Sequence, residues 1–126
     1  MNATSAPIIG ICGGGNLAHA MAGWLGARGL RVNILTRKPE QWNKTISASF
    51  PDGTALRAPL GRIGNHPEIL EECSLVLVAV PRFGIREICL RIKPFLRRDQ
   101  GLAIVPGTPD VMDMAEDASW TSSVSL

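Results

Sequence analysis

The stretch at residues 8–25, IIGICGGGNLAHAMAGWL, decides the fold. Its first five residues are mostly apolar and β-branched, which predicts a short buried strand. Gly13, Gly15 and Ala18 then follow with the spacing G-x-G-x-x-A, and apolar residues after them recur at helical intervals. The stretch therefore predicts a strand, a glycine turn and a helix, which is the opening unit of a dinucleotide-binding fold.

Each position of the spacing has a physical role in such a unit. Gly13 permits the tight turn out of the strand, and Gly15 lets a pyrophosphate approach the backbone because it has no side chain. Ala18 is small enough for the helix and the strand to pack closely. The helix would direct its first amides and its positive dipole end at the phosphates, with Asn16 as its expected N-cap.

Other ligands and other families fit the glycine spacing less well. A glycine turn that binds nothing, or that serves another nucleotide-like ligand, stays open as an alternative. A phosphate loop of the G-K-[ST] kind is excluded because no Lys follows the glycines. An S-adenosylmethionine methyltransferase is disfavoured, since the segment Thr36-Arg37-Lys38 has no acidic residue at the end of the second strand to bind a ribose.

The rest of the chain alternates between strand and helix patterns. After the first helix, for which Gly29 is the expected stop, we expect further strands at 30–35, 74–80 and 101–105 and helices at 40–46, 66–73 and 84–93. The region 47–64 is irregular, with one hairpin arm at 54–58 and a short strand at 62–64. On the helix at 84–93 an apolar stripe faces inward, and four charged residues, Arg86, Glu87, Arg91 and Lys93, are expected to face water.

This order predicts an α/β fold with a doubly wound parallel sheet, a Rossmann-type NAD(P)-binding domain. We place that domain at 7–110, between an N-terminal tail at 1–6 and an irregular acidic and polar tail at 111–126. Ligands of such sheets bind outside the carboxyl ends of the strands. Four loops should therefore surround one cleft: 13–16, 36–38, 81–84 and 106–109.

Composition narrows the function classes. The chain has 126 residues, a net charge of +2, no Tyr and 5% aromatic residues, which argues against a base-stacking nucleic-acid surface. No signal peptide or membrane span is visible, so we expect a cytoplasmic protein. Cys12, Cys73 and Cys89 are too few and too widely spaced for a metal site or a disulfide framework, and we interpret them as reduced core thiols.

Three segments resemble one known family. The segments ICGGGNLAHA at 11–20, VNILT at 32–36 and LVLVAVP at 75–81 resemble the N-terminal domain of the opine (octopine and nopaline) dehydrogenases. The same plan is shared by NAD-dependent glycerol-3-phosphate dehydrogenases and ketopantoate reductases. The resemblance covers about 7–109 and implies that hydride from a reduced nicotinamide reduces an imine, formed from an amino acid and a 2-oxo acid.

The resemblance and the glycine spacing together give the expected cofactor site. Pro81 and Arg82 match the family's loop over the cofactor, whereas His19 matches a motif position that is not the catalytic histidine. We expect no metal ligand and no catalytic residue in this chain. The expected cofactor-binding residues are Gly13, Gly14, Gly15, Asn16, Leu17, Ala18, Thr36, Arg37, Lys38, Val80, Pro81 and Arg82.

The basic segment at 36–38 bears on the choice between NADP and NAD. It lies about 20 residues after the glycines, where an Asp or Glu normally binds the ribose of NAD. Arg37 and Lys38 supply positive charge and Thr36 a hydroxyl, which suits a 2′-phosphate and predicts a preference for NADP. A basic turn exposed to solvent is the alternative interpretation.

Members of the family also have a second, helical domain with a catalytic His-Asp pair. No such segment follows 7–110 in this chain. We therefore expect a fragment that binds the cofactor but is inactive alone, and whose partners are the missing catalytic domain or a second copy that meets an unpaired edge at 101–105. Two alternatives stay open: a non-catalytic NADP(H)-binding redox sensor, and the cofactor domain of an enzyme like glycerol-3-phosphate dehydrogenase or ketopantoate reductase.

Overall fold

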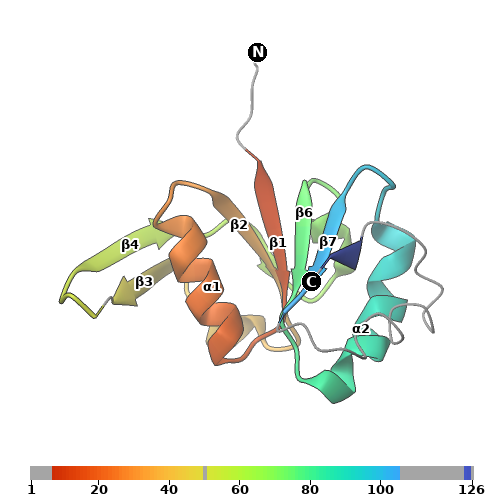
Figure 1. The fold of residues 1–126 in the computed structure, drawn as a ribbon, viewed down its shortest axis with the longest axis horizontal. Helices are drawn as coiled ribbons and strands as arrows, with labels where there is room; N and C mark the ends of the chain where they lie inside the picture. The colour runs from red at the N-terminus through yellow and green to blue at the C-terminus, as the bar shows by residue number, and fades with distance from the viewer. Residues whose placement is uncertain (1–6, 50, 106–123, 126) are drawn as a thin grey trace, which may run out of the picture.

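The computed structural model describes residues 7–49, 51–105 and 124–125. The described residues form strands and two α-helices, with four short 3-10 helices between them (Figure 1). In chain order the elements are β1 Ile8–Cys12, α1 Asn16–Gly26, β2 Arg31–Leu35, η1 Pro39–Gln41, β3 Thr45–Ser49, β4 Ala55–Pro59, β5 Ile63–Gly64, η2 Pro67–Leu70, β6 Leu75–Val78, η3 Arg82–Gly84, α2 Ile85–Ile92, η4 Lys93–Phe95, β7 Gly101–Ile104 and β8 Val124–Ser125.

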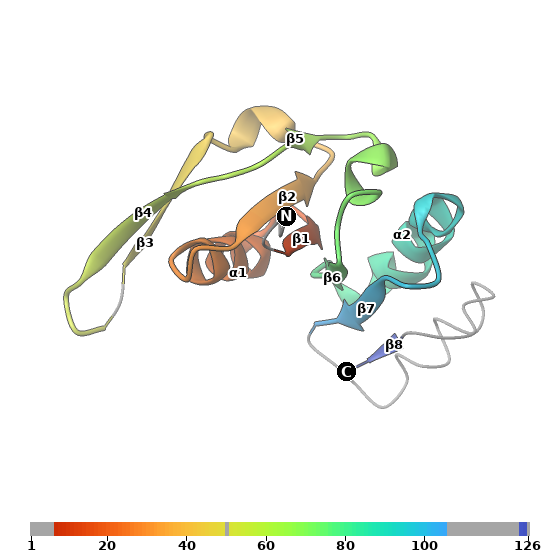
Figure 2. The ribbon, with the colours of Figure 1, turned by 90° about the horizontal axis from the view of Figure 1, so that it is seen from above.

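The main sheet has the order β5-β2-β1-β6-β7-β8, and all its strand pairs are parallel. The chain builds outward from β1 through β2 to β5 and then returns to place β6 on the other side of β1. Figure 2 shows α1 on one face of this sheet and α2 with η2 on the other. The expected α/β fold with a doubly wound parallel sheet is therefore confirmed, and its switch point lies between β1 and β6.

Two apolar cores fill the spaces between the sheet and its helices. On one face Ile9 and Ile11 of β1 pack with Ala18 and Ala22 of α1. On the other face η2 and α2 cover the sheet, and most of the expected inward stripe of α2 is buried there, with Ile88 only partly buried. Gly10 lies on this second face, where a Cβ would come within 2.7 Å of Leu70 Cδ2. The absence of a side chain at this position allows η2 to pack directly on β1.

The three cysteines lie in the second core as free thiols, as expected. Burial raises the pKa of Cys73 and that of Cys89 to about 11 and also raises the pKa of Cys12. All three thiols are therefore protonated at neutral pH, and they serve as packing groups rather than nucleophiles.

The expected stop of the first helix is also confirmed. Gly29 has φ +83°, and its amide donates to the carbonyl of Gly26. The amide of Leu30 donates to the carbonyl of Leu25. This pair of bonds is a Schellman motif, which favours glycine at the left-handed position.

Two expected helices are wrong in extent. The segment expected as a helix at 40–46 forms only the turn η1, and β3 then begins at Thr45. Tertiary contacts explain the change, because β3 pairs with β4 along their full length and Ala58 packs against Gly26 of α1. The segment expected as a helix at 66–73 likewise forms only η2. By contrast, the hairpin arm near 54–58 and the short strand near 62–64 are confirmed as β4 and β5.

The far edge of the sheet differs from the expectation of an irregular tail at 111–126. Val124 and Ser125 form β8, which pairs with Leu102 and Ala103 of β7. Two residues give too short a pattern to identify a strand in the sequence. The expected unpaired edge at 101–105 is therefore partly covered. The loop at 106–109 lies outside the described residues, and self-association stays a prediction.

Asn33 is a buried polar residue in the middle of β2, and its hydrogen bonds connect β2 to η2 and to the segment before β5. It is 0% exposed. Its Nδ2 donates to the carbonyl of Ile69 at 3.0 Å, and its Oδ1 accepts from the amide of Arg62 at 2.9 Å. The first bond holds η2 against the sheet, and the second holds the entry to β5.

We expect Asn33→Ala to lower the free energy of unfolding by about 2–4 kcal/mol, because it removes the hydrogen bonds to the buried carbonyl of Ile69 and to the amide of Arg62 and leaves a gap at a fully buried position. Urea unfolding followed by circular dichroism measures the change. Asn43 is exposed and provides the matched control, and Asn43→Ala should shift stability by less than about 0.5 kcal/mol. Equal stability of the two variants would show that Asn33 is not a structural tie.

Candidate functional site

The glycine turn after β1 needs glycine at its first position. Gly13 has φ +145°, a backbone conformation that side chains disfavour. A Cβ at Gly13 would lie 2.3 Å from the carbonyl oxygen of Ala79, just past β6. The amide of Gly13 donates to the carbonyl of Leu35 at 3.0 Å. The turn is therefore fixed between the carboxyl ends of β2 and β6.

The next two glycines, Gly14 and Gly15, differ in the space around them. A Cβ at Gly14 would lie 2.8 Å from Thr36 Oγ1, whereas a Cβ at Gly15 would meet nothing within 4 Å. The space at Gly15 is thus open, as a close approach by a ligand requires. Ala18, which is fully buried, lies 3.5 Å from a Cβ built on Gly13, so its small size is needed for the packing of α1.

The N-terminus of α1 has no side-chain cap. The helix begins at Asn16 with Gly15 as the N-cap residue, so the expectation of Asn16 as the cap is wrong. The reason is that the chain enters the helix directly from the glycine turn, one residue earlier than the sequence suggested. No acidic residue lies in the first turn. The first amides and the positive end of the dipole are therefore available to an anion.

His19 has a structural place beside this turn. Its Nδ1 lies 2.9 Å from the carbonyl oxygen of Gly15, and its ring stacks on that of Trp42 with centroids 3.6 Å apart. Trp42 is buried, and its Nε1 has no hydrogen-bond partner among the described residues. The stack connects the start of α1 to the segment after η1. His66 is exposed in the turn before η2, so neither histidine lines the pocket described next.

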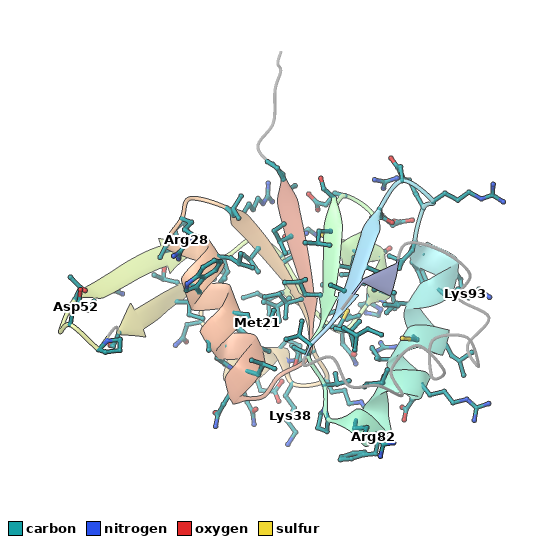
Figure 3. All side chains as sticks on the ribbon, viewed as in Figure 1. Met21, Arg28, Lys38, Asp52, Arg82 and Lys93 are labelled. Carbon is teal, nitrogen blue, oxygen red and sulfur yellow. The ribbon has the colours of Figure 1, made fainter. Side chains whose placement is uncertain are left out.

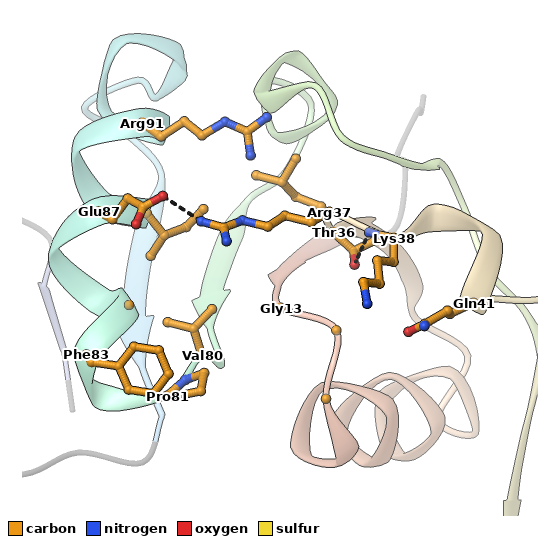
Figure 4. A pocket seen from close by; sticks show the side chains of 15 residues that line it. Gly13, Thr36, Arg37, Lys38, Gln41, Val80, Pro81, Phe83, Glu87 and Arg91 are labelled. Atoms are coloured by element: carbon orange, nitrogen blue, oxygen red, sulfur yellow. Dashed lines mark hydrogen bonds and ion pairs between the residues drawn. The ribbon is translucent and has the colours of Figure 1, made fainter.

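A pocket of about 400 Å³ lies at the carboxyl ends of the strands. Figure 3 shows Lys38 and Arg82 at this same edge of the molecule, and Figure 4 shows the pocket. Three of the four expected loops contribute to it. The expected residues that line it are Gly13, Gly14, Gly15, Thr36, Arg37, Lys38, Val80 and Pro81, whereas Asn16, Leu17, Ala18 and Arg82 are not among its lining residues.

Sequence reasoning missed the wall that α2 contributes. Glu87, Ile88 and Arg91 line the pocket, and Phe83 lies at its side with 89% exposure. Glu87 and Arg91 were expected to face water. An amphipathic pattern distinguishes the core side of a helix from its polar side, but it cannot distinguish open solvent from a cleft. One signal was available in the sequence. Glu87 and Arg91 are four residues apart, so they share one side of a helix, and that helix directly follows a loop expected at the cleft.

Charged groups from both sides of the pocket meet across it. Arg37 Nη2 donates to Glu87 Oε1 at 2.5 Å (Figure 4). Arg91 donates from Nη2 to Oδ1 of Asn65 at 3.0 Å and also to the carbonyl of Asn65. Thr36 is buried, and its Oγ1 accepts from the amide of Lys38 at 3.2 Å. The pocket therefore combines three cationic side chains with one carboxylate among its described lining residues.

The described lining residues offer positive charge to an anion. They include no histidine, cysteine or serine, and their carboxylate is engaged with Arg37. Across the described ranges there is no group of three or more His, Cys, Asp or Glu residues suited to a metal ion. Within the same ranges, no helix has the length and apolar character needed to cross a lipid bilayer.

Comparison with known proteins gives one family and several relatives. Residues 8–107 match the family model of the NAD-dependent glycerol-3-phosphate dehydrogenase N-terminus. The glycerol-3-phosphate dehydrogenase [NAD(P)+] of Clostridium acetobutylicum is 31% identical over 93 residues, which are 70% of this chain and 28% of that protein. The tauropine dehydrogenase of Arabella iricolor is 24% identical over 143 aligned positions, covering 94% of this chain and 36% of the relative.

Solved structures share the fold. An octopine dehydrogenase in complex with NADH and L-arginine superimposes with a TM-score of 0.76 at 23% identity, covering 94% of this chain and 34% of that one. A ketopantoate reductase from Ralstonia eutropha JMP134 gives 0.73 at 16% identity, with 87% and 37% covered.

The chain spans about a third of the length of the curated relatives that it matches. The family match itself extends from the first strand to just past β7 and contains every described residue that lines the pocket. The chain therefore belongs to the family of N-terminal NAD(P)-binding domains represented by NAD-dependent glycerol-3-phosphate dehydrogenase.

Proposed function

We propose that the pocket binds a nicotinamide dinucleotide, with the pyrophosphate over Gly15 and the adenosine ribose beside Arg37. The open space over Gly15, at a helix start without a side-chain cap, is the observation that carries this proposal. An anion there would accept hydrogen bonds from backbone amides and would benefit from the helix dipole. Val80 and Pro81 supply an apolar wall for the rest of the dinucleotide.

For the reaction, we favour the reduction of an imine formed from an amino acid and a 2-oxo acid. The names of two relatives, octopine dehydrogenase and tauropine dehydrogenase, support an opine-type activity, and both comparisons cover 94% of this chain. The bound cofactor would supply the hydride. The second candidate is glycerol-3-phosphate oxidation and reduction, which is favoured by the family model and by the 31% identical relative.

This chain would bind the cofactor and would not supply the groups that react with the substrate. Hydride transfer to an imine also needs a substrate held against the nicotinamide and a group that transfers protons. Among the described residues, His19 is stacked on Trp42 and His66 lies outside the pocket. We therefore propose that another domain supplies the catalytic groups. The three free thiols support a reducing compartment such as the cytoplasm.

Gly15→Val tests the binding site directly. We expect at least a roughly tenfold loss of NADH and NADPH affinity, because a branched side chain would fill the space for the pyrophosphate. Isothermal titration calorimetry measures the affinity, and circular dichroism checks the fold. Gly64→Val is the matched control, because a Cβ at Gly64 also meets nothing within 4 Å but Gly64 does not line the pocket. Unchanged binding by a folded Gly15→Val protein would refute the assignment.

Arg37→Ala tests the choice of cofactor. We expect the wild-type chain to bind NADPH more tightly than NADH, and the substitution to remove most of that difference, roughly 10- to 100-fold for a charge-assisted bond to a phosphate. The readout is the ratio of the two dissociation constants at fixed salt. Arg57 is exposed on the hairpin, outside the pocket, so Arg57→Ala controls for the loss of charge. Equal dissociation constants of the wild-type chain for NADPH and NADH would favour the alternative, in which the segment 36–38 is a basic turn exposed to solvent.

An absorbance assay at 340 nm tests whether the chain acts alone. We expect no steady oxidation of NADPH with pyruvate and amino acids, and no reduction of NADP⁺ with glycerol 3-phosphate, since no described histidine lines the pocket. Turnover that depends on the substrates and disappears in Gly15→Val would show that the chain contains its own catalytic groups. Either substrate pair would then also identify the reaction.

A further inference from the structure

One ion pair spans the mouth of the pocket. Arg37 follows β2 and Glu87 lies on α2, so the pair links the loop after β2 to the helix that follows β6. Both side chains are largely exposed, at 76% and 70%. Neither belongs to an apolar core, and exposed ion pairs contribute little to stability, so we expect the fold to survive loss of the pair.

The carboxylate of Glu87 lies among cationic side chains, in a position where a ligand anion could also bind. Arg37 contacts it directly, and Arg91 lies one helical turn further along α2 on the same side (Figure 4). Residues four apart on a helix are neighbours on its surface. Lys38 faces the same pocket from the opposite wall. Glu87 therefore occupies a place where positive charge converges from both walls.

We propose that Glu87 determines cofactor selectivity by competing with the 2′-phosphate of NADPH for Arg37. This inference rests on the proposed function and extends it to a residue that sequence reasoning had assigned to solvent. Glu87 occupies Nη2 of Arg37, so a 2′-phosphate would compete with the carboxylate for that donor and would lie near a like charge. NADH has no 2′-phosphate, so its binding does not meet the same competition.

The exposure of Arg37 and Glu87 limits how much Glu87 can change the affinity for NADPH. Solvent screens exposed ion pairs, so Glu87→Gln should raise NADPH affinity by roughly three- to tenfold and change NADH affinity by less than about twofold. The gain should shrink as ionic strength rises, because both the pair and the repulsion are screened. A merely structural role for the pair would instead change thermal stability and leave the ratio of affinities unchanged.

The experiment compares wild type and Glu87→Gln by calorimetry with four probes: NADPH, NADH, adenosine 2′,5′-bisphosphate and 5′-AMP. We expect Glu87→Gln to gain affinity for the two probes with a 2′-phosphate only. The matched control is Glu72→Gln, which removes another ion pair, with Arg62 at 3.3 Å, outside the pocket. In an Arg37→Ala background the gain from Glu87→Gln should be clearly smaller, because the competition for that guanidinium is gone and only the like-charge repulsion remains.

The outcomes separate this inference from the proposed function. If both dinucleotides bind and Glu87→Gln leaves their ratio unchanged, or raises both affinities equally, the competition is refuted while dinucleotide binding stands. If wild type binds none of the four probes at concentrations up to the millimolar range, the proposed function fails and the inference fails with it. A gain of the same size in Glu72→Gln would also refute the inference, since it would reflect net charge rather than the position of Glu87.

Discussion

The close approach of Gly13 to the carbonyl of Ala79 is the constraint on which the site depends. A Cβ at Gly13 would lie 2.3 Å from that oxygen, so the turn can pass between the ends of β2 and β6 only without a side chain. The hydrogen bond from Gly13 to Leu35 fixes the turn from the other side. The start of α1, the basic segment after β2 and the loop after β6 consequently meet at one pocket.

The parts of the fold and site that the sequence predicted are those set by local chemistry. The bounds of β1, the three residues of the glycine spacing and the stop at Gly29 depend on backbone conformation and side-chain size within a few residues. The buried stripe of α2 follows from helical period alone. The loops at the carboxyl ends of the strands could then be placed around one cleft, since parallel strands end at the same edge.

The parts that the sequence could not predict depend on partners far along the chain. The helix expected at 40–46 does not form, because the residues from Thr45 onward pair as β3 with β4, which lies further along the chain and packs on α1. Asn33 looks like an ordinary strand residue until η2 and the segment before β5 supply its hydrogen-bond partners. Glu87 belongs to the site because α2 forms one wall of the pocket, where Glu87 meets Arg37, fifty positions earlier in the chain.

The site therefore separates two kinds of residue. Gly13 and Ala18 pack closely against their neighbours, so a side chain added at either position would disturb the fold itself. Arg37 and Glu87 lie outside both apolar cores and are mostly exposed, so substitutions there cost little stability. Charge at the pocket mouth can consequently vary while the glycine turn stays fixed. Under the proposed function, the choice between NAD and NADP would depend on this exposed charge and would not require a change in the glycine turn.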